Sequence, residues 1–186
     1  MTQAQVDSAQ DVVAFLKAQH DQIKSLFQQV TSLTGSEREE KFVELRRLLA
    51  VHETAEEEVV HPRAKSEIAN GDKIVSARLE EEHDAKEALA ELEKLDVDST
   101  EFETRFRAFQ ADVLAHAAAE ESDEFPKLEA QLDDEQLAKM RNAVRMAEAT
   151  APTRPHAGVE SKAANMMAGP FAAMLDRARD MIRGKG

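Results

Sequence analysis

The 186-residue chain contains no cysteine, tyrosine or tryptophan. Without cysteine the protein can form no disulfide, no zinc–thiolate site and no thiolate-based catalytic centre. The missing tyrosine also excludes a tyrosyl radical and a tyrosine–iron bond. No apolar run reaches the roughly 20 residues that a membrane helix needs, and the first residues lack the basic and apolar parts of a secretory signal. We therefore predict a cytoplasmic protein with no transmembrane segment.

The chain is acidic, with a formal net charge of −13. Residues 1–149 show no basic face of the kind that binds nucleic acid, so we expect no nucleic-acid partner. The acidic side chains are typical of solvated helix faces, and their field also favours the approach of cations. Glycine and proline are scarce in this region while helix-forming residues are abundant, which favours an all-α protein.

Apolar residues recur at helical spacing in five segments. The first four are long and are joined by short loops, whereas the fifth, from about Asp134 to Ala149, is shorter. This pattern predicts an up-down-up-down four-helix bundle with a short fifth helix and a C-terminal extension. We expect the second helix to weaken at Pro62 and the fourth to end near Pro126, because proline lacks the amide donor that a helix interior uses.

The composition divides the chain into three regions. We predict the helical bundle in residues 1–149, a Pro-rich linker in residues 150–158 and a basic amphipathic tail in residues 159–186. A basic amphipathic segment can dock a partner or an anionic membrane surface. A loosely packed terminal helix is the simpler interpretation of the same tail.

An internal repeat places histidine and glutamate at matching points of two helical hairpins. The second helix carries His52 and Glu56, the fourth carries His116 and Glu120, and a proline follows ten residues after each histidine. Residues four apart are separated by about 40° around a helix axis, so each pair presents both side chains to one point. The two pairs are therefore expected to face each other across the bundle.

The first and third helices each add one histidine to the repeat. On the first helix His20 shares the apolar seam, and on the third helix His83 stacks four residues after Leu79, which itself follows Val75 by four. Six polar side chains are thus predicted to point into the middle of the bundle as metal ligands: His20, His52, Glu56, His83, His116 and Glu120.

A buried set of four imidazoles and two carboxylates needs a cation to neutralise the carboxylates. Facing carboxylates would repel each other and would cost several kcal/mol if nothing neutralised them. Four imidazoles with two carboxylates suit iron, manganese or zinc, and six ligands exceed what one tetrahedral zinc takes. Two metal ions that share the carboxylates fit the set better than one.

The order H…HxxxE…H…HxxxE over residues 12–126 resembles the motif of the hemerythrin-like HHE cation-binding family. The tail resembles extensions of actinobacterial members. The resemblance implies two non-haem iron ions with an oxo or hydroxo bridge inside a four-helix bundle. Oxygen-carrying hemerythrins have a second histidine on the third helix and an aspartate on the fourth, where this chain has Glu87 and Glu120, which argues against reversible oxygen carriage. Glu53, beside His52, matches a ligand of some family members and is a possible further metal ligand.

The ligand count implied by this resemblance leaves open coordination positions on each iron. We therefore expect a protein that reacts with a small-molecule oxidant or ligand, namely peroxide, oxygen or nitric oxide, with catalase-like peroxide breakdown as one form. The alternatives are a non-enzymatic sensor of oxygen, nitric oxide or redox state, and a protein of iron homeostasis. Whether the chain is an enzyme stays open at this point.

Two further features of the polar residues bear on this assignment. A ferritin-like centre needs two E-x-x-H pairs and a glutamate on each of the other helices. The pairs Glu58/His61 and Glu80/His83 have this spacing, but residues 8–32 contain no glutamate. On an ideal helix His61 lies about 180° from His52, so we expect it near the helix end, in packing or solvent, rather than as a ligand.

Overall fold

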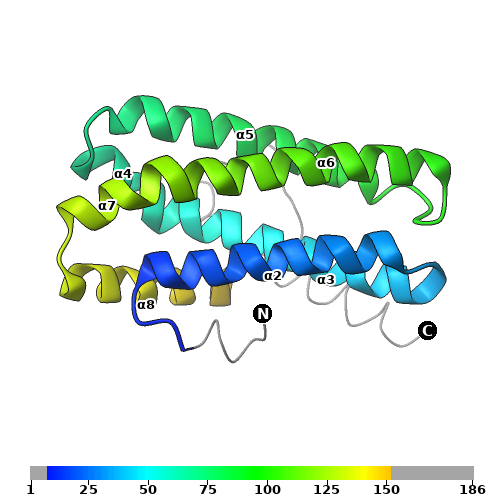
Figure 1. Ribbon diagram of the computed structural model, residues 1–186, viewed down its shortest axis with the longest axis horizontal. Coiled ribbons are helices and arrows are strands. Elements are labelled where there is room, and N and C mark those ends of the chain that lie inside the picture. Colours follow the sequence, from blue (N-terminus) through cyan, green and yellow to red (C-terminus); the bar gives the residue numbers. More distant parts are fainter. Residues whose placement is uncertain (1–7, 152–186) are drawn as a thin grey trace.

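The computed structural model describes residues 8–151, and each element within them is helical. The four long helices are α2 (Val12–Ser32), α3 (Gly35–Ala55), α5 (Gly71–Leu92) and α6 (Thr100–Ala119). Figure 1 shows them lying side by side along the long axis, with consecutive helices running in opposite directions. The predicted four-helix bundle is confirmed. The predicted tail and all but residues 150 and 151 of the predicted linker lie outside the described residues.

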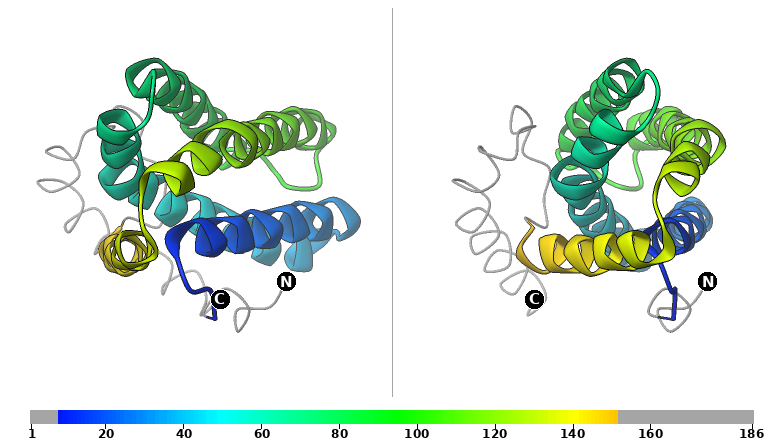
Figure 2. Two further views of the ribbon diagram at one scale, coloured as in Figure 1. Left: turned by 60° about the vertical axis from the view of Figure 1, so that its left-hand side comes forward. Right: turned by 90° about the vertical axis from the view of Figure 1, so that its left-hand side faces the viewer.

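The fifth helix, α8 (Asp134–Thr150), covers one end of the bundle. It packs against α2 and α3, and the right-hand view of Figure 2 shows it crossing the bundle axis. Its first turn is closed by a capping box, in which the Asp133 side chain accepts from the Gln136 amide and the Gln136 side chain accepts from the Asp133 amide. These bonds satisfy amides that would otherwise have no partner in the helix, so the short helix has a defined start.

The second and fourth helices continue past their prolines. Each passes through one π-helical turn, η1 (Glu56–Val60) or η2 (Glu120–Glu124), into a further α-helical segment, α4 (His61–Glu67) or α7 (Phe125–Gln131). The prediction that the fourth helix ends near Pro126 is therefore wrong, whereas the weakening predicted near Pro62 takes the form of a π-turn within a continuing helix. Each proline lies in the first turn after the π-turn, where a missing amide donor breaks no helical hydrogen bond.

The apolar core is divided into two clusters with a polar layer between them. One cluster occupies the end covered by α4, α7 and α8, and the other fills the opposite end with five phenylalanines. On α2 the boundary is visible within two turns, because Leu16 belongs to the first cluster, Ile23 to the second, and His20 lies between them. The polar layer is thus shielded from water on two sides by packed side chains.

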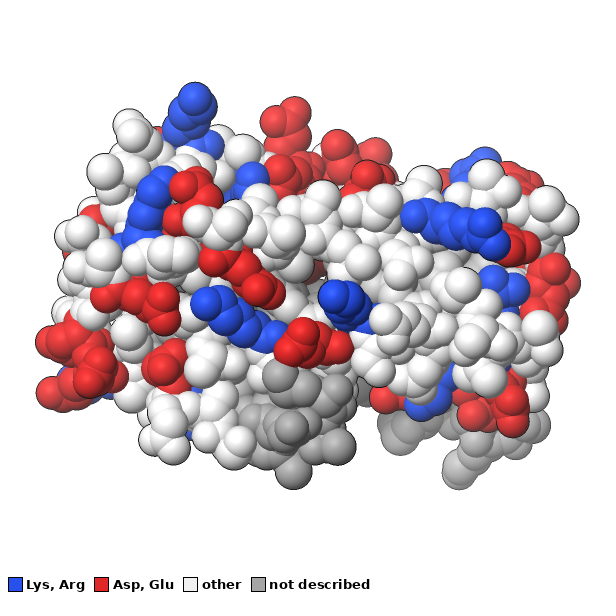
Figure 3. Space-filling model, viewed as in Figure 1, with Lys and Arg blue, Asp and Glu red and all other residues white. Residues whose placement is uncertain are grey.

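The surface carries charges of both signs. On the face shown in Figure 3, acidic and basic side chains are interspersed. Elsewhere in the chain, exposed pairs such as Glu103 and Arg107 lie one helical turn apart at 2.5 Å. Such exposed pairs contribute little to stability. None of the helices in residues 8–151 is long and apolar enough to cross a membrane.

The phenylalanine cluster generates a stability prediction. Phe106 is fully buried, and its ring centre lies 5.3 Å from those of both Phe27 and Phe102. Truncation in Phe106→Ala should lower the free energy of unfolding by about 3–5 kcal/mol, because it removes buried area and leaves a cavity. Urea denaturation followed by circular dichroism measures the change. Met146→Ala, at the 74% exposed Met146, is the control and should change stability by less than about 0.5 kcal/mol; equal effects would contradict this description of the core.

Candidate metal centre

The polar layer contains three overlapping groups of potential metal ligands. Within each group the ligand atoms all lie within 4.8 Å of one another. The groups are His20, His52 and Glu56; then Glu56, Glu82, His116 and Glu120; and then His61, Glu120 and Glu124. Because Glu56 and Glu120 each occur in two groups, the three groups form one continuous cluster. Five of the six predicted ligands are therefore brought together.

The inward atoms of this cluster face a common point, and most of their contacts with one another are long. The Nε2 atoms of His20 and His52 are 3.1 Å apart. Each imidazole Nε2 also faces a carboxylate, His20 and His116 facing Glu120 at 3.4 and 3.5 Å and His52 facing Glu56 at 3.4 Å. Distances of 3.4–3.5 Å exceed those of good N–H···O hydrogen bonds. The same atoms would be drawn together by a cation placed among them.

The outer nitrogen of His52 is held by two successive hydrogen bonds that lead through Gln19 to Glu148 on α8. Gln19 donates through its Nε2 to Glu148 at 2.6 Å, which leaves the Gln19 amide oxygen to accept from His52 Nδ1 at 2.9 Å. His52 therefore carries its proton on Nδ1 and turns the Nε2 lone pair toward the cluster. Burial lowers the pKa of His52 well below its usual value, and the neighbouring His20 lowers it further, so this imidazole stays neutral.

Two further imidazoles of the cluster are held in the same way by carboxylates. His20 Nδ1 donates to Glu121 at 2.8 Å, and His116 Nδ1 donates to Glu81 at 2.9 Å. Histidine ligands of metals usually donate their second ring nitrogen to such a group, which fixes the tautomer and the ring orientation. Three histidines thus show the hydrogen-bonding pattern of metal ligands.

Unpaired buried atoms provide the test of whether these residues fit a cation. Both oxygens of Glu56 and of Glu120, one oxygen each of Glu82 and Glu124, and Nε2 of His116 are shielded from solvent and have no hydrogen-bond partner. A buried acceptor without a partner loses its hydration and gains nothing in return. These atoms are all nitrogen or carboxylate oxygen, the donor set of borderline and hard divalent metals. The residues present therefore fit a metal cation.

The facing carboxylates have opposite pKa shifts when no metal is bound. Burial raises the pKa of Glu56 well above its usual value, and the nearby Glu120 raises it further. Burial also acts to raise the pKa of Glu120, but His116 and His20 outweigh it and lower that pKa to about 2. A proton on Glu56 thus relieves the repulsion between the two groups. A cation would displace this proton and do the same.

The π-turns bring His61 and Glu124 into the layer. Nine residues of ideal α-helix would turn His61 away from His52, but a π-turn takes up an extra residue and sets those after it back by roughly 100°. His61 is 1% exposed, with Nε2 2.5 Å from Glu82 and Nδ1 3.2 Å from Glu124. Burial lowers the pKa of His61, but the two carboxylates outweigh it and raise the pKa well above its usual value. The expectation that His61 faces away from the site is wrong.

On α5 the structure brings Glu82 into the cluster, and it does not bring His83 there. The His83 side chain is 41% exposed and lies 3.5 Å from Glu87, whereas Glu82 is 1% exposed. Steps of four residues drift by about 40° each, so His83 lies roughly 80° around the helix from Val75, while Glu82, seven residues on, lies within about 20°. The buried face of α5 therefore follows 3/4 spacing through Glu82. The prediction that His83 points into the middle of the bundle is wrong.

Glu53 is buried beside the cluster but belongs to none of the three groups. It shares its surroundings with Lys86, whose ammonium group bonds Glu57. Burial raises the pKa of Glu53 to about 8, although Lys86 acts in the opposite direction. Its assignment as a further ligand stays a prediction.

The two halves of the cluster differ at one matching position. His61 lies directly before Pro62 in the first hairpin, and Phe125 lies directly before Pro126 in the second. The Phe125 ring is fully buried and stacks on His20, with ring centres 5.8 Å apart and planes inclined by 15°. One half therefore has an imidazole between carboxylates where the other has an aromatic wall.

Comparisons with known proteins agree with this geometry. The model of the hemerythrin HHE cation-binding domain matches residues 11–128. The chain belongs to this HHE family. The predicted family resemblance is therefore confirmed. Domains of the family bind metal cations, typically iron, and this HHE protein has His/Glu groups that could hold a metal ion.

Two relatives were found by sequence and by structure. A protein named DNA nickase from Nostoc sp. (strain PCC 7120) is 28% identical over 128 residues, which make up 68% of this chain but only 35% of the relative's own length. The crystal structure of an HHE cation-binding domain-containing protein from Mycobacterium kansasii, an Rv2633c homologue, superposes with a TM-score of 0.67. It is 21% identical, with 75% of this chain and 85% of that chain covered, and it supports the fold.

The Gln19 contact generates a prediction about metal affinity. Gln19→Ala removes the acceptor that orients His52, and loss of such an outer contact should weaken iron binding about 10- to 100-fold. Equilibrium competition against a coloured iron chelator measures the affinity. Gln28→Ala, at an exposed position of the same helix, is the matched control and should bind as the wild type does. Unchanged affinity in Gln19→Ala would show that the hydrogen bond to His52 does not support the site.

Proposed function

We propose that this HHE protein holds two non-haem iron ions, joined by an oxo or hydroxo bridge, and reacts with small oxidants such as hydrogen peroxide, oxygen or nitric oxide. The observation that carries the proposal is the convergence of unpaired buried donor atoms on one point of the bundle. Glu56 and Glu120 would be the shared carboxylates, because each belongs to two of the three ligand groups.

The first ligand group supports iron as the metal. Two imidazoles and one carboxylate, here His20, His52 and Glu56, are the ligand set of many non-haem iron(II) sites with open coordination positions. The second group adds His116, Glu120 and Glu82, with His61 and Glu124 next to it. Iron bound there would supply redox chemistry toward oxygen, peroxide or nitric oxide.

The chain itself would orient the ligands and exclude water. Gln19, Glu121 and Glu81 hold the three imidazoles through their outer nitrogens. Apolar clusters on both sides keep the layer dry, which strengthens every electrostatic interaction inside it. In the metal-free protein, Glu53 keeps its proton near neutral pH because burial raises its pKa to about 8.

The named relative raises a different activity. The protein from Nostoc sp. is called a DNA nickase, and this chain spans about a third of its length. The absence of a nucleic-acid partner stays a prediction, as do the cytoplasmic location and the tail's docking role. The site described above supports redox chemistry of small molecules, so we place that function first and keep sensing and iron homeostasis as alternatives.

Ligand assignment can be tested by comparing His52→Ala with His83→Ala. His52→Ala should lose most of the iron per chain and most of the rise in Tm that iron produces, because metal bound to the folded state stabilises it by mass action. His83→Ala should keep both. Elemental analysis and calorimetry of metal-free and iron-loaded samples provide the measurements. Equal iron loss in the two variants would restore His83 to the ligand set and contradict the exclusion of its half-exposed side chain.

Reaction with peroxide can be tested on the iron-loaded full chain. Peroxide should disappear, with release of oxygen, at least tenfold faster than with the same concentration of free iron, since open positions at a bound redox metal favour turnover. An oxygen electrode and peroxide absorbance follow the reaction. Metal-free protein and His52→Ala are the controls. A rate equal to that of free iron, at full iron occupancy, would remove peroxide breakdown from the proposal and favour the sensor or storage alternatives.

A further inference from the structure

A groove between α5 and α6 leads from the surface to the buried ligand cluster. Its inner part is a cavity of about 340 Å³ whose lining includes the exposed Asp84 and Asp112 as well as the cluster residue His116. Its outer part continues along the same two helices as a hollow of about 670 Å³. Asp84, Ala88, Phe109 and Asp112 line both parts, so the two form one α5–α6 groove.

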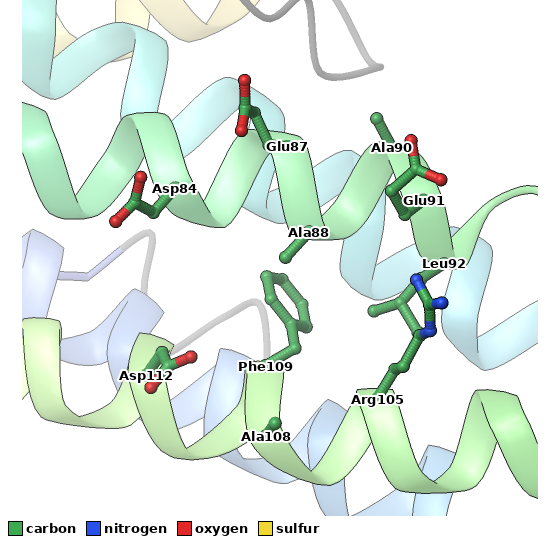
Figure 4. Close-up of a pocket in the computed structure, with 10 residues that line it drawn as sticks. All are labelled: Asp84, Glu87, Ala88, Ala90, Glu91, Leu92, Arg105, Ala108, Phe109 and Asp112. Carbon is green, nitrogen blue, oxygen red and sulfur yellow. The ribbon is translucent and has the colours of Figure 1, made fainter.

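The shape of the groove follows from the side chains on its walls. Figure 4 shows the Phe109 ring extending from α6 toward Ala88 of α5, with Asp84 and Asp112 facing the gap from opposite helices. Small residues such as Ala85, Ala88 and Ala115 line the inner part and leave space between the helices. The space is therefore bounded by apolar walls while its mouth carries carboxylates.

The lining of the inner part is rich in carboxyl groups. Five of its residues have carboxyl side chains, and none is lysine or arginine: Glu53, Glu81, Glu82, Asp84 and Asp112. In the outer part, Arg105 is paired with Glu101 at 2.7 Å. A cleft with negative groups and low-dielectric walls concentrates field lines and raises the local concentration of cations.

A second observation shows where the groove ends. Glu82 lines its inner part and is 1% exposed, and one of its carboxylate oxygens has no hydrogen-bond partner. His116, which lines the same part, has an unpaired Nε2. Both residues belong to the ligand group that also contains Glu56 and Glu120. The groove therefore ends on unpaired donor atoms, which is where a cation would complete its coordination.

We propose that the α5–α6 groove is the loading route for divalent cations, with Asp84 and Asp112 attracting the hydrated ion and Glu82 replacing part of its water. The carboxylates become less exposed along this path, from exposed aspartates through the 41% exposed Glu81 to the buried Glu82. A hard cation can exchange water for carboxylate oxygen in such steps without becoming bare. This inference rests on the proposed iron site but concerns the rate of filling rather than its final occupancy.

The double variant Asp84→Asn/Asp112→Asn tests the route. Metal-free full chain is mixed anaerobically with Fe²⁺ at low ionic strength, quenched with excess chelator at set times, desalted, and analysed for iron per chain. Loading should slow about tenfold because the attracting field is weakened, and the final iron per chain should equal that of the wild type. The difference should shrink in about 0.5 M NaCl, where surface charges are screened.

The control variant is Glu39→Gln/Glu40→Gln, which removes the same two charges from exposed positions at the start of α3. It should load at the wild-type rate. The proposed route is overturned if the groove variant loads as fast as the wild type, or if the control slows equally, since the effect would then be one of net charge. A lower final iron content in the groove variant would also overturn it, by making the aspartates part of the site. A wild-type chain that takes up no iron refutes the site itself.

Discussion

Glu56 and Glu120 lie in the middle of the bundle, fully buried, with no hydrogen-bond partner for any of their four oxygens. Mutual repulsion in a dry interior makes this arrangement costly for two ionised carboxylates, and either a proton on Glu56 or a cation between the two groups would relieve it. The imidazoles turn their Nε2 atoms toward the same point, where they would bind such a cation. Hydrogen bonds to their outer nitrogens hold them in this orientation. The apolar clusters on either side remove the water that would otherwise solvate the carboxylates.

The features that were predictable from the sequence are those set by local periodicity. Apolar spacing predicted four long helices and a short fifth, and the two H-x-x-x-E pairs fell on buried faces because a helix turn fixes their relation. His20 was predictable for the same reason, since 3/4 spacing from Leu16 to Ile23 passes through it. These features depend on spacing within single helices and not on which helices pack against each other.

The features that were missed depend on small departures from ideal helices or on distant partners. A π-turn has no clear sequence signature, although a proline six residues after each glutamate marks where one is tolerated. Glu82 could have been found by stepping seven residues from Val75 rather than four and four. The bond between Gln19 and Glu148 joins residues 129 positions apart, and only the packing of α8 on α2 brings them together.

The difference between His61 and Phe125, at matching positions of the two hairpins, has a consequence for the proposed pair of ions. The Phe125 ring, which stacks on His20, offers no charge and no lone pair. The His61 imidazole lies between Glu82 and Glu124, so its half of the ligand cluster is lined by ionisable groups. Two ions bound in such unlike surroundings, as proposed above, would differ in affinity and in reduction potential. Under the proposed function the two hairpins would form two unequal metal sites, so one site would fill before the other, and a half-loaded molecule would be a defined species rather than a random mixture.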